Sequence, residues 1–199
     1  MPDFDIFTEA NRRDMDDLKR MIMECGERIE IPRNGYFVQA GDYCGEVGYI
    51  CHGSFKCGRT DCRGKERILA FMFEGEFIAD YLPARNATPA VIDMRAMEDS
   101  VVYRISIADH RDFFEREIDG SVYVRRFIEE LAFCHMRKSL SLACESPEER
   151  YFGLQARVPD IFSRVNLKDI ASYIGVTPET LSRMRTAYLR RNGGGDAKY

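Results

Sequence analysis

Apolar residues recur at two spacings along this chain, and the change from one spacing to the other marks its elements. From residue 4 to 25 they lie three or four positions apart, which predicts an amphipathic helix ending at Gly26. Between residues 28 and 106, short runs rich in β-branched and aromatic side chains alternate with turn residues, which predicts strands. Helical spacing returns after residue 106. We therefore expect an α+β protein in which a β region separates helices.

The β region has regular turns. Four of the glycines there, at positions 41, 53, 64 and 75, recur at intervals of 11 or 12 residues, and residues 83–89 (PARNATP) predict a loop. Short strands with such turns are typical of a β-barrel or a β-sandwich, and we expect an antiparallel β-barrel of the jelly-roll kind. The predicted strands are residues 36–39, 48–51, 54–59, 67–73, 91–96 and 101–105.

Two helices are expected after the β region, at residues 108–116 and 122–143. Apolar residues cover more than one stripe of the longer helix, so two of its sides must be buried. One side can cover the barrel and the other can meet the same helix of a second subunit; burial within a single subunit is the alternative. As a dimerisation helix it would use Val124, Phe127, Ile128, Leu131, Cys134 and His135.

The C-terminal part predicts a helix-turn-helix. Ser146-Pro147-Glu148-Glu149 is a capped helix start, and two more helices are expected at about residues 167–174 and 178–190. Gly175 suits a left-handed C-cap between them, and Thr177 suits the N-cap of the second helix. In a helix-turn-helix that second helix enters the major groove of DNA. The expected DNA contacts are Lys168, Thr177, Pro178, Glu179, Thr180, Ser182, Arg183 and Arg185.

Charge favours DNA over the alternative of an ordinary helical hairpin. Residues 161–192 hold six Lys and Arg against two Asp and Glu, whereas the whole chain of 199 residues has a net charge of −4. A basic end on an acidic body is the asymmetry expected when one end meets phosphate. No apolar run is long enough to span a bilayer, and the N-terminus is unlike a signal peptide, so we expect a cytoplasmic protein without membrane contact.

The seven cysteines give a second hypothesis. Cys44, Cys51, Cys57 and Cys62 could form a redox or metal sensor, but their spacing fits no structural zinc pattern and they fall among strands, where alternate residues face opposite ways. We favour free thiols and predict no metal. An enzyme is not expected, because the β region offers only His52 and no nucleophile–base pair is evident.

Three segments resemble the CRP/FNR superfamily of bacterial transcription regulators: LKDIASYIGVTPETLSRMR, EGEFIADY and RAMEDSVVYRIS. The resemblance covers nearly the whole chain. It implies a homodimer on a pseudo-palindromic DNA operator, with Arg183 reading a guanine and Glu179 accepting from a cytosine or orienting the arginine. An activator would also contact RNA polymerase, although no local motif marks such a surface.

The resemblance also implies the domain organisation. Residues 1–119 would form an effector-sensing barrel of the cyclic-nucleotide-binding kind, residues 120–145 the dimerisation helix, and residues 146–199 the helix-turn-helix domain with a disordered tail. Only eight residues follow Arg191, so the family's wing hairpin is not expected.

The same comparison implies an effector pocket at Gly75, Phe77, Ile78, Ala79, Asp80, Arg85 and Thr88. The family places Gly-Glu at the ribose and an Arg-Ser or Arg-Thr pair at the cyclic phosphate. Here Ala79-Asp80 replaces the first pair, and residues 88–91 contain no arginine. A phosphate without its bidentate arginine loses a strong contact. We therefore predict weak or no binding of cyclic AMP, no assigned cofactor, and another small-molecule effector or none. FNR-type cluster cysteines are absent from residues 1–24.

Overall fold

The computed structural model describes residues 9–117, 132–133 and 136–192. These divide into two compact units, Met1–Arg59 with Leu69–Met136, and Thr60–Ile68 with Arg137–Tyr199. Each unit is described separately. None of the described helices is long and apolar enough to cross a membrane.

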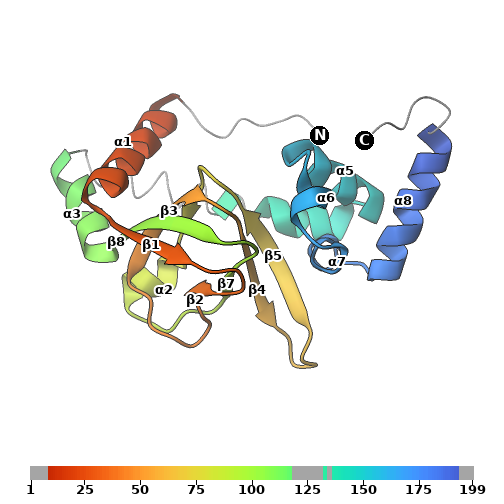
Figure 1. Ribbon diagram of the computed structural model, residues 1–199, viewed down its shortest axis with the longest axis horizontal. Coiled ribbons are helices and arrows are strands. Elements are labelled where there is room, and N and C mark those ends of the chain that lie inside the picture. The colour runs from red at the N-terminus through yellow and green to blue at the C-terminus, as the bar shows by residue number, and fades with distance from the viewer. Residues whose placement is uncertain (1–8, 118–131, 134–135, 193–199) are drawn as a thin grey trace. The chain divides into compact units, whose positions relative to one another are not determined.

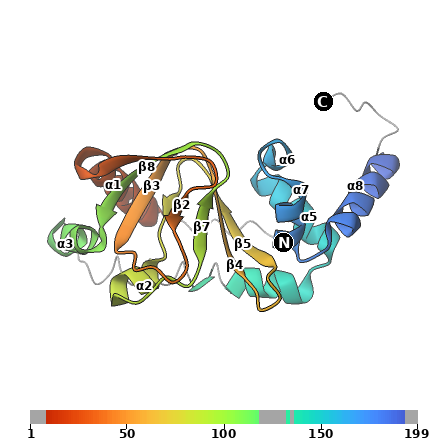
Figure 2. The same cartoon turned by 60° about the horizontal axis from the view of Figure 1, so that its bottom comes forward.

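The first unit is a β-sandwich with helices (Figure 1). One sheet has the strand order β1-β8-β3-β6 and the other β2-β7-β4-β5. The strands are β1 (Glu27–Ile31), β2 (Tyr36–Val38), β3 (Glu46–His52), β4 (Phe55–Thr60), β5 (Glu66–Met72), β6 (Phe77–Ile78), β7 (Asp93–Ala96) and β8 (Ser100–Ser106). Figure 2 shows β2, β7, β4 and β5 beside one another.

The expected jelly-roll barrel is not closed, because the described strands form two separate sheets, and the structure is the sandwich that the strand pattern also allowed. The edge strand β6 has only two residues and β2 only three. Strands this short offer few N–H and C=O groups for pairing, and no ladder joins the two sheets among the described strands. The main core lies between the sheets, where Ile50 and Val102 of one sheet meet Phe55 and Met94 of the other. Burial of such apolar side chains is the main stabilising contribution to the sandwich.

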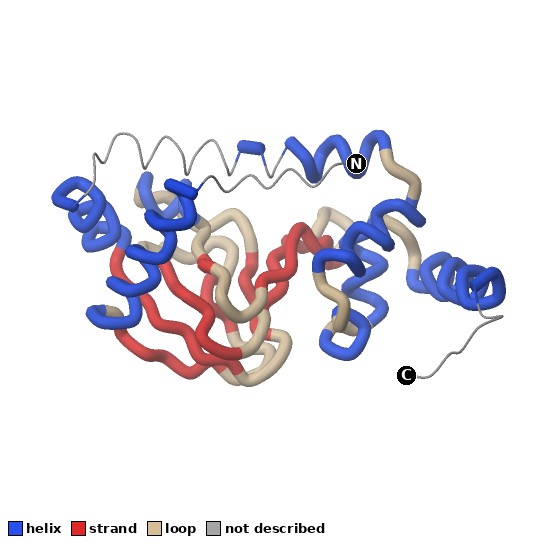
Figure 3. Tube along the Cα trace, turned by 90° about the horizontal axis from the view of Figure 1, so that it is seen from above, coloured by secondary structure: helices blue, strands red, loops and turns tan. Residues whose placement is uncertain are grey.

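Helices α1 (Glu9–Cys25) and α3 (Ile107–Glu117) pack against the β3–β8 pair. Leu18 and Ile22 of α1 form a second buried cluster with Val47, Tyr49 and Ile105. Figure 3 shows both helices beside the strands of this unit. The N-terminal helix predicted from the apolar spacing is therefore confirmed over its described residues.

The turns of the β region occur at the regularly spaced glycines. Gly41, Gly53, Gly64 and Gly75 all have positive φ, between 74° and 95°, a conformation that costs residues with a Cβ free energy. At Gly53 an added Cβ would also lie 2.1 Å from the Ser100 hydroxyl. The regular glycines therefore mark turns, as the sequence predicted.

The predicted loop at residues 83–89 is wrong in its first half, because α2 (Tyr81–Asn86) occupies it. Pro83 stands in the first turn, where the missing proline N–H has no helical partner to lose. The helix ends at Ala87, which takes the left-handed conformation with φ 50°. The strands β1 and β6 were also not predicted.

Apart from the hairpin tip Thr60–Ile68, the described part of the second unit is helical. Residues 137–144 are helical, followed by α5 (Pro147–Arg157), α6 (Ile161–Arg164), α7 (Leu167–Ile174) and α8 (Pro178–Asn192). The predicted capping box is present at α5, with the Ser146 hydroxyl accepting from the Glu149 N–H and the Glu149 carboxylate from the Ser146 N–H. The short helix α6 was not predicted. Of the predicted dimerisation contacts, all six lie outside the described residues.

Candidate nucleic-acid interface

Two capped ends define α7. The Asn166 side chain accepts a 2.9 Å hydrogen bond from the Asp169 N–H and donates to the Asp169 carboxylate at 2.8 Å. At the other end Gly175 takes a left-handed conformation with φ 84°, and its N–H donates to Ala171 and Ser172 carbonyls. These contacts satisfy groups that a helix end otherwise leaves unpaired. The predicted role of Gly175 is confirmed.

A three-residue turn, residues 175–177, leads into α8. The Thr180 N–H donates to the Thr177 hydroxyl at 3.3 Å, so Thr177 caps the helix as its sequence position predicts. Hydrogen bonds from the Glu179 N–H and from the Thr177 hydroxyl lower the pKa of the Glu179 carboxyl, and the charges of Lys65 and Arg183 lower it further. Glu179 is therefore an anion and a hydrogen-bond acceptor at the exposed start of α8.

The helix α8 has one buried and one outward face. Leu181 is fully buried, as are Ile170, Ala171 and Ile174 of α7, so the two helices are fixed to one another by packing. Glu179, Ser182 and Arg183 are exposed, and Thr180 is half-buried. Arg183 donates to the Thr180 hydroxyl at 3.3 Å. The structure thus places four of the predicted contact residues on or beside one exposed surface, hereafter the α8 outer face.

Thr186 also lies on this face and was missed. It is exposed and stands seven residues after Glu179 and three after Arg183, which is the spacing of one helix face. Its hydroxyl donates to the Ser182 carbonyl at 3.0 Å. Lys168 is exposed in the first turn of α7, and Pro178 is half-buried at the start of α8.

Arg185 lies elsewhere. Its guanidinium is 4.6 Å from the ring centroid of Phe162, within the range of a cation–π contact. Burial raises the pKa of the neighbouring Tyr151 hydroxyl, and the charge of Arg185 opposes that rise. Arg185 therefore contacts the aromatic residues of α5 and α6 and is only half-exposed.

Two cations hold the carboxyl end of α7. Arg150 donates to the carbonyl of Ile174 at 2.6 Å, and also to the carbonyls of Ser141 and Glu145. Lys138 donates to the Tyr173 carbonyl at 3.0 Å and lies over the ring of the same residue. Cations are favourable where helix carbonyls are left unpaired. These contacts join α7 to the helical residues 137–144 within the second unit.

In the first unit the segment around α2 has an acidic side chain turned inward. Asp80 is only 8% exposed, and its Oδ2 atom accepts a 2.8 Å hydrogen bond from the Val91 N–H. The Asp80 carbonyl also accepts from the Ala84 N–H, which begins α2. The carboxylate thus joins residues on both sides of α2.

The residues of the implied effector pocket do not share one environment. Ile78 is fully buried in the core between the sheets, whereas Phe77 and Ala79 pack against the cluster beneath α1. Arg85 and Thr88 are exposed, and Gly75 is exposed in a turn with φ 88°.

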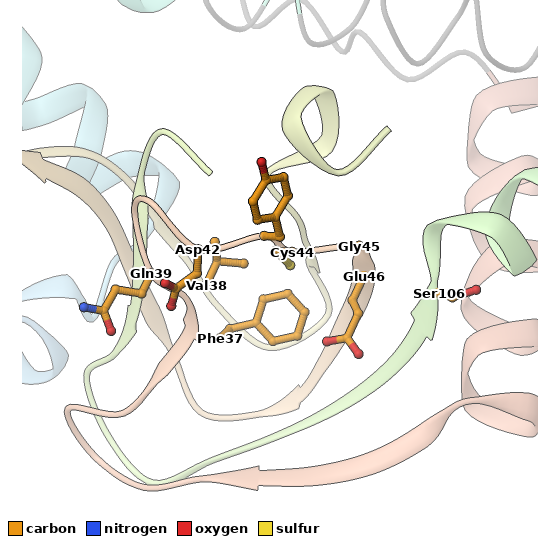
Figure 4. A pocket seen from close by; sticks show the side chains of 9 residues that line it. Phe37, Val38, Gln39, Asp42, Cys44, Gly45, Glu46 and Ser106 are labelled. Carbon is orange, nitrogen blue, oxygen red and sulfur yellow. The ribbon is translucent and has the colours of Figure 1, made fainter. Parts of the chain in front are cut away.

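A different hollow of about 480 Å³ opens beside β2 and the start of β3 (Figure 4). The picture shows the Phe37 ring near its centre, with Asp42 on one side and Glu46 on the other. Glu46 is paired with Arg104 at 2.8 Å. The lining residues are Phe37, Val38, Gln39, Asp42, Tyr43, Cys44, Gly45, Glu46 and Ser106.

The four cysteines of the second hypothesis have different surroundings. Cys57 is buried, Cys44 is intermediate, and Cys51 and Cys62 are exposed. Burial raises the pKa of Cys57 to about 12, which disfavours the thiolate that binds metals. Among the side chains that the structure describes, no three His, Cys, Asp or Glu gather as a metal site.

The comparison with solved structures shows which proteins have this fold. FixK2 from Bradyrhizobium japonicum matches with a TM-score of 0.71 at 16% identity, over 87% of this chain and 89% of that chain. The c-di-GMP-responsive global regulator CLP of Xanthomonas campestris matches with a TM-score of 0.65 at 17% identity, over 92% and 95%. Catabolite activator protein of Thermus thermophilus matches with a TM-score of 0.53 at 19% identity, over 94% and 87%. The chain therefore shares its fold with these proteins, and the resemblance seen in the sequence is confirmed at the level of the fold.

The sequence of the sandwich gives a second match. Residues 28–117 match the family model for the cyclic nucleotide-binding domain. No curated protein sequence matches the chain as a relative.

Proposed function

We propose that this protein is a sequence-specific DNA-binding transcription regulator in which α7 and α8 form the helix-turn-helix and α8 reads the major groove. The observation that carries the proposal is the α8 outer face. Glu179, Ser182 and Arg183 are exposed on a helix whose opposite side is fixed through Leu181. Arginine and glutamate are side chains that recognise guanine and cytosine edges.

We further propose that it acts as a homodimer. Met136 and Leu140, on the helical residues that precede α5, are 53% and 47% exposed in the single chain. Residues four apart lie on the same helix face, so these two apolar side chains support a partner helix there. Readers of this kind bind two half-sites about one DNA turn apart, which requires a two-fold dimer.

The sandwich would act as the sensor, but not for cyclic AMP. The inward carboxylate of Asp80 already binds the Val91 N–H, and residues 88–91 offer no arginine to a phosphate. A phosphate placed near a buried carboxylate would be repelled, and its desolvation would not be repaid. The effector, if the protein has one, would therefore be a different small molecule.

The redox or metal sensor is less well supported than this function. The raised pKa of Cys57 leaves its thiol protonated at neutral pH, and the described cysteines do not converge. The structural neighbours named above are regulators, which favours a protein without catalytic activity.

The Arg183→Ala variant tests the reading helix. We expect it to weaken binding to an operator duplex by about 1–3 kcal/mol and to relax preference at one base pair of each half-site. Arg33→Ala removes an exposed arginine of the first unit, and as the matched control it should bind as tightly as wild type. Affinity equal to wild type in Arg183→Ala, measured by fluorescence anisotropy, would refute the assignment.

A further inference from the structure

The tip of the β4–β5 hairpin belongs to the second unit. The unit comprises Thr60–Ile68 together with the C-terminal helices. The turn is held by one side chain, because Asp61 Oδ1 accepts from the N–H groups of Arg63 at 2.9 Å and Lys65 at 3.0 Å. Gly64 completes it with φ 74°. The backbone of the tip is therefore fixed by its own hydrogen bonds.

This fixed turn presents cations. Arg63 and Lys65 are both exposed. The nearest acid in the turn, Asp61, pairs with Arg67 at 2.8 Å rather than with either of them. Two exposed positive charges thus project from a short, rigid turn.

The tip is attached to α7 through Ser172. The Ile68 N–H donates to the Ser172 hydroxyl at 3.0 Å, and that hydroxyl donates to the Glu66 carbonyl at 3.1 Å. Ile68 itself is buried. The Ser172 hydroxyl therefore both accepts and donates a hydrogen bond, and these two bonds hold the hairpin tip against α7.

The tip lies on the side where α8 begins. The pKa of the Glu179 carboxyl is lowered first by hydrogen bonds from its own N–H and from Thr177, and then by nearby positive charges that include Lys65. Glu179 is exposed at the start of the α8 outer face. The ammonium of Lys65 therefore flanks the surface that we propose for base contacts.

We propose that Arg63 and Lys65 bind backbone phosphates of the DNA that receives α8. The inference rests on the proposed function and extends it to residues outside the helix-turn-helix. Phosphates border the groove on both sides, and contacts to them set the register of the protein on the duplex. Because the backbone of the tip is already fixed by its own hydrogen bonds, ordering is confined to the two side chains when they engage. Thr60–Ile68 lies within residues 28–117, so the sensor domain would itself contribute to DNA affinity.

The test compares wild type with the double variant Arg63→Ala/Lys65→Ala. Binding to a selected operator duplex and to a scrambled duplex is measured by anisotropy between about 50 and 200 mM salt. Each lost phosphate contact removes about 0.9 from the slope of log K against log salt. We expect the slope to fall by about 2 and affinity at about 0.1 M salt to fall at least roughly tenfold, equally on both duplexes.

Two controls make the result specific. Arg20→Ala/Arg33→Ala removes the same charge from exposed sites of the first unit and should leave the slope unchanged. Arg63→Lys/Lys65→Arg keeps the charges and should retain the wild-type slope. If Arg63→Ala/Lys65→Ala binds DNA as tightly as wild type and its slope of log K against log salt is unchanged, this inference is overturned while the proposed function stands. A wild-type protein without affinity for any duplex would overturn the proposed function as well.

Discussion

Asp80 and Val91 are joined by a 2.8 Å hydrogen bond in which the backbone N–H of Val91 donates to a buried carboxylate. The two residues lie on either side of α2, eleven positions apart in the chain. The resemblance found in the sequence implies that this segment would contact a cyclic phosphate. In this chain a side chain of the protein accepts the hydrogen bond from the segment's backbone.

This hydrogen bond should stabilise the first unit. Asp80→Ala leaves the Val91 N–H without its acceptor, and we expect the free energy of unfolding to fall by about 1–3 kcal/mol. Asp80→Asn keeps an acceptor and should lose less, about 1 kcal/mol. Urea unfolding measures both. Equal stability of wild type and Asp80→Ala would show that the contact contributes nothing.

Cyclic AMP should not bind. Titration calorimetry of the full chain with cyclic AMP should give no saturable heat, because the phosphate would meet the Asp80 carboxylate and no arginine at residues 88–91. Asp80→Asn should not restore tight binding, since the arginine is still missing. Micromolar saturation in the wild type would contradict the argument.

Arg150 should hold the second unit together. Its guanidinium donates to the carbonyls of Ile174, Ser141 and Glu145, and Arg150→Ala would remove these three hydrogen bonds. The Ser141 carbonyl would keep the hydrogen bond from the Glu145 N–H. We expect a loss of about 2–4 kcal/mol in the free energy of unfolding, measured with denaturant. Arg150→Lys is the matched control: its single ammonium cannot reach all three carbonyls, so the loss should be intermediate. A loss below about 0.5 kcal/mol would refute this role.

His110 should make the first unit sensitive to acid. Its ring meets Tyr81 of α2 edge to face at 5.8 Å, and burial lowers its pKa from 6.5 to about 4. Between these two pH values the unfolded chain binds more protons than the folded one, so stability is lost as pH falls from 6.5 through 4. The loss from this group is up to roughly 3 kcal/mol.

The His110→Phe variant isolates that contribution, because it keeps an aromatic ring beside Tyr81 and cannot titrate. Its free energy of unfolding should fall less steeply than that of wild type between pH 6.5 and 4. Parallel curves for the two proteins would show that His110 is not buried in the neutral form.

Local signals predicted the helix pair well. Gly175 and Thr177 act on the backbone within a few residues, and their capping roles follow from residue type and position. The same holds for the capping box at Ser146. The helix α2 was missed because Pro83 and Asn86 are usual turn residues, and only the position of Pro83 in the first turn makes a helix possible there.

Contacts between elements that lie far apart along the chain could not be predicted from the sequence. The side of α8 on which Arg185 lies depends on where α5 and α6 pack, and Phe162 of the unpredicted α6 receives its guanidinium. The Asp80–Val91 contact depends on the path of the chain around α2. Spacing along a sequence gives the face of an element, but not the partner that covers it.

Selection of DNA from a random duplex library with the purified full-length protein tests the central claim most directly. We expect enrichment of a pseudo-palindrome whose half-sites lie about one helical turn, roughly 10 base pairs, apart. Arg183→Ala should lose the preference for one base pair in each half-site. A library that stays unenriched after repeated rounds, with wild type and variant alike, would contradict the assignment of this chain as a sequence-specific regulator.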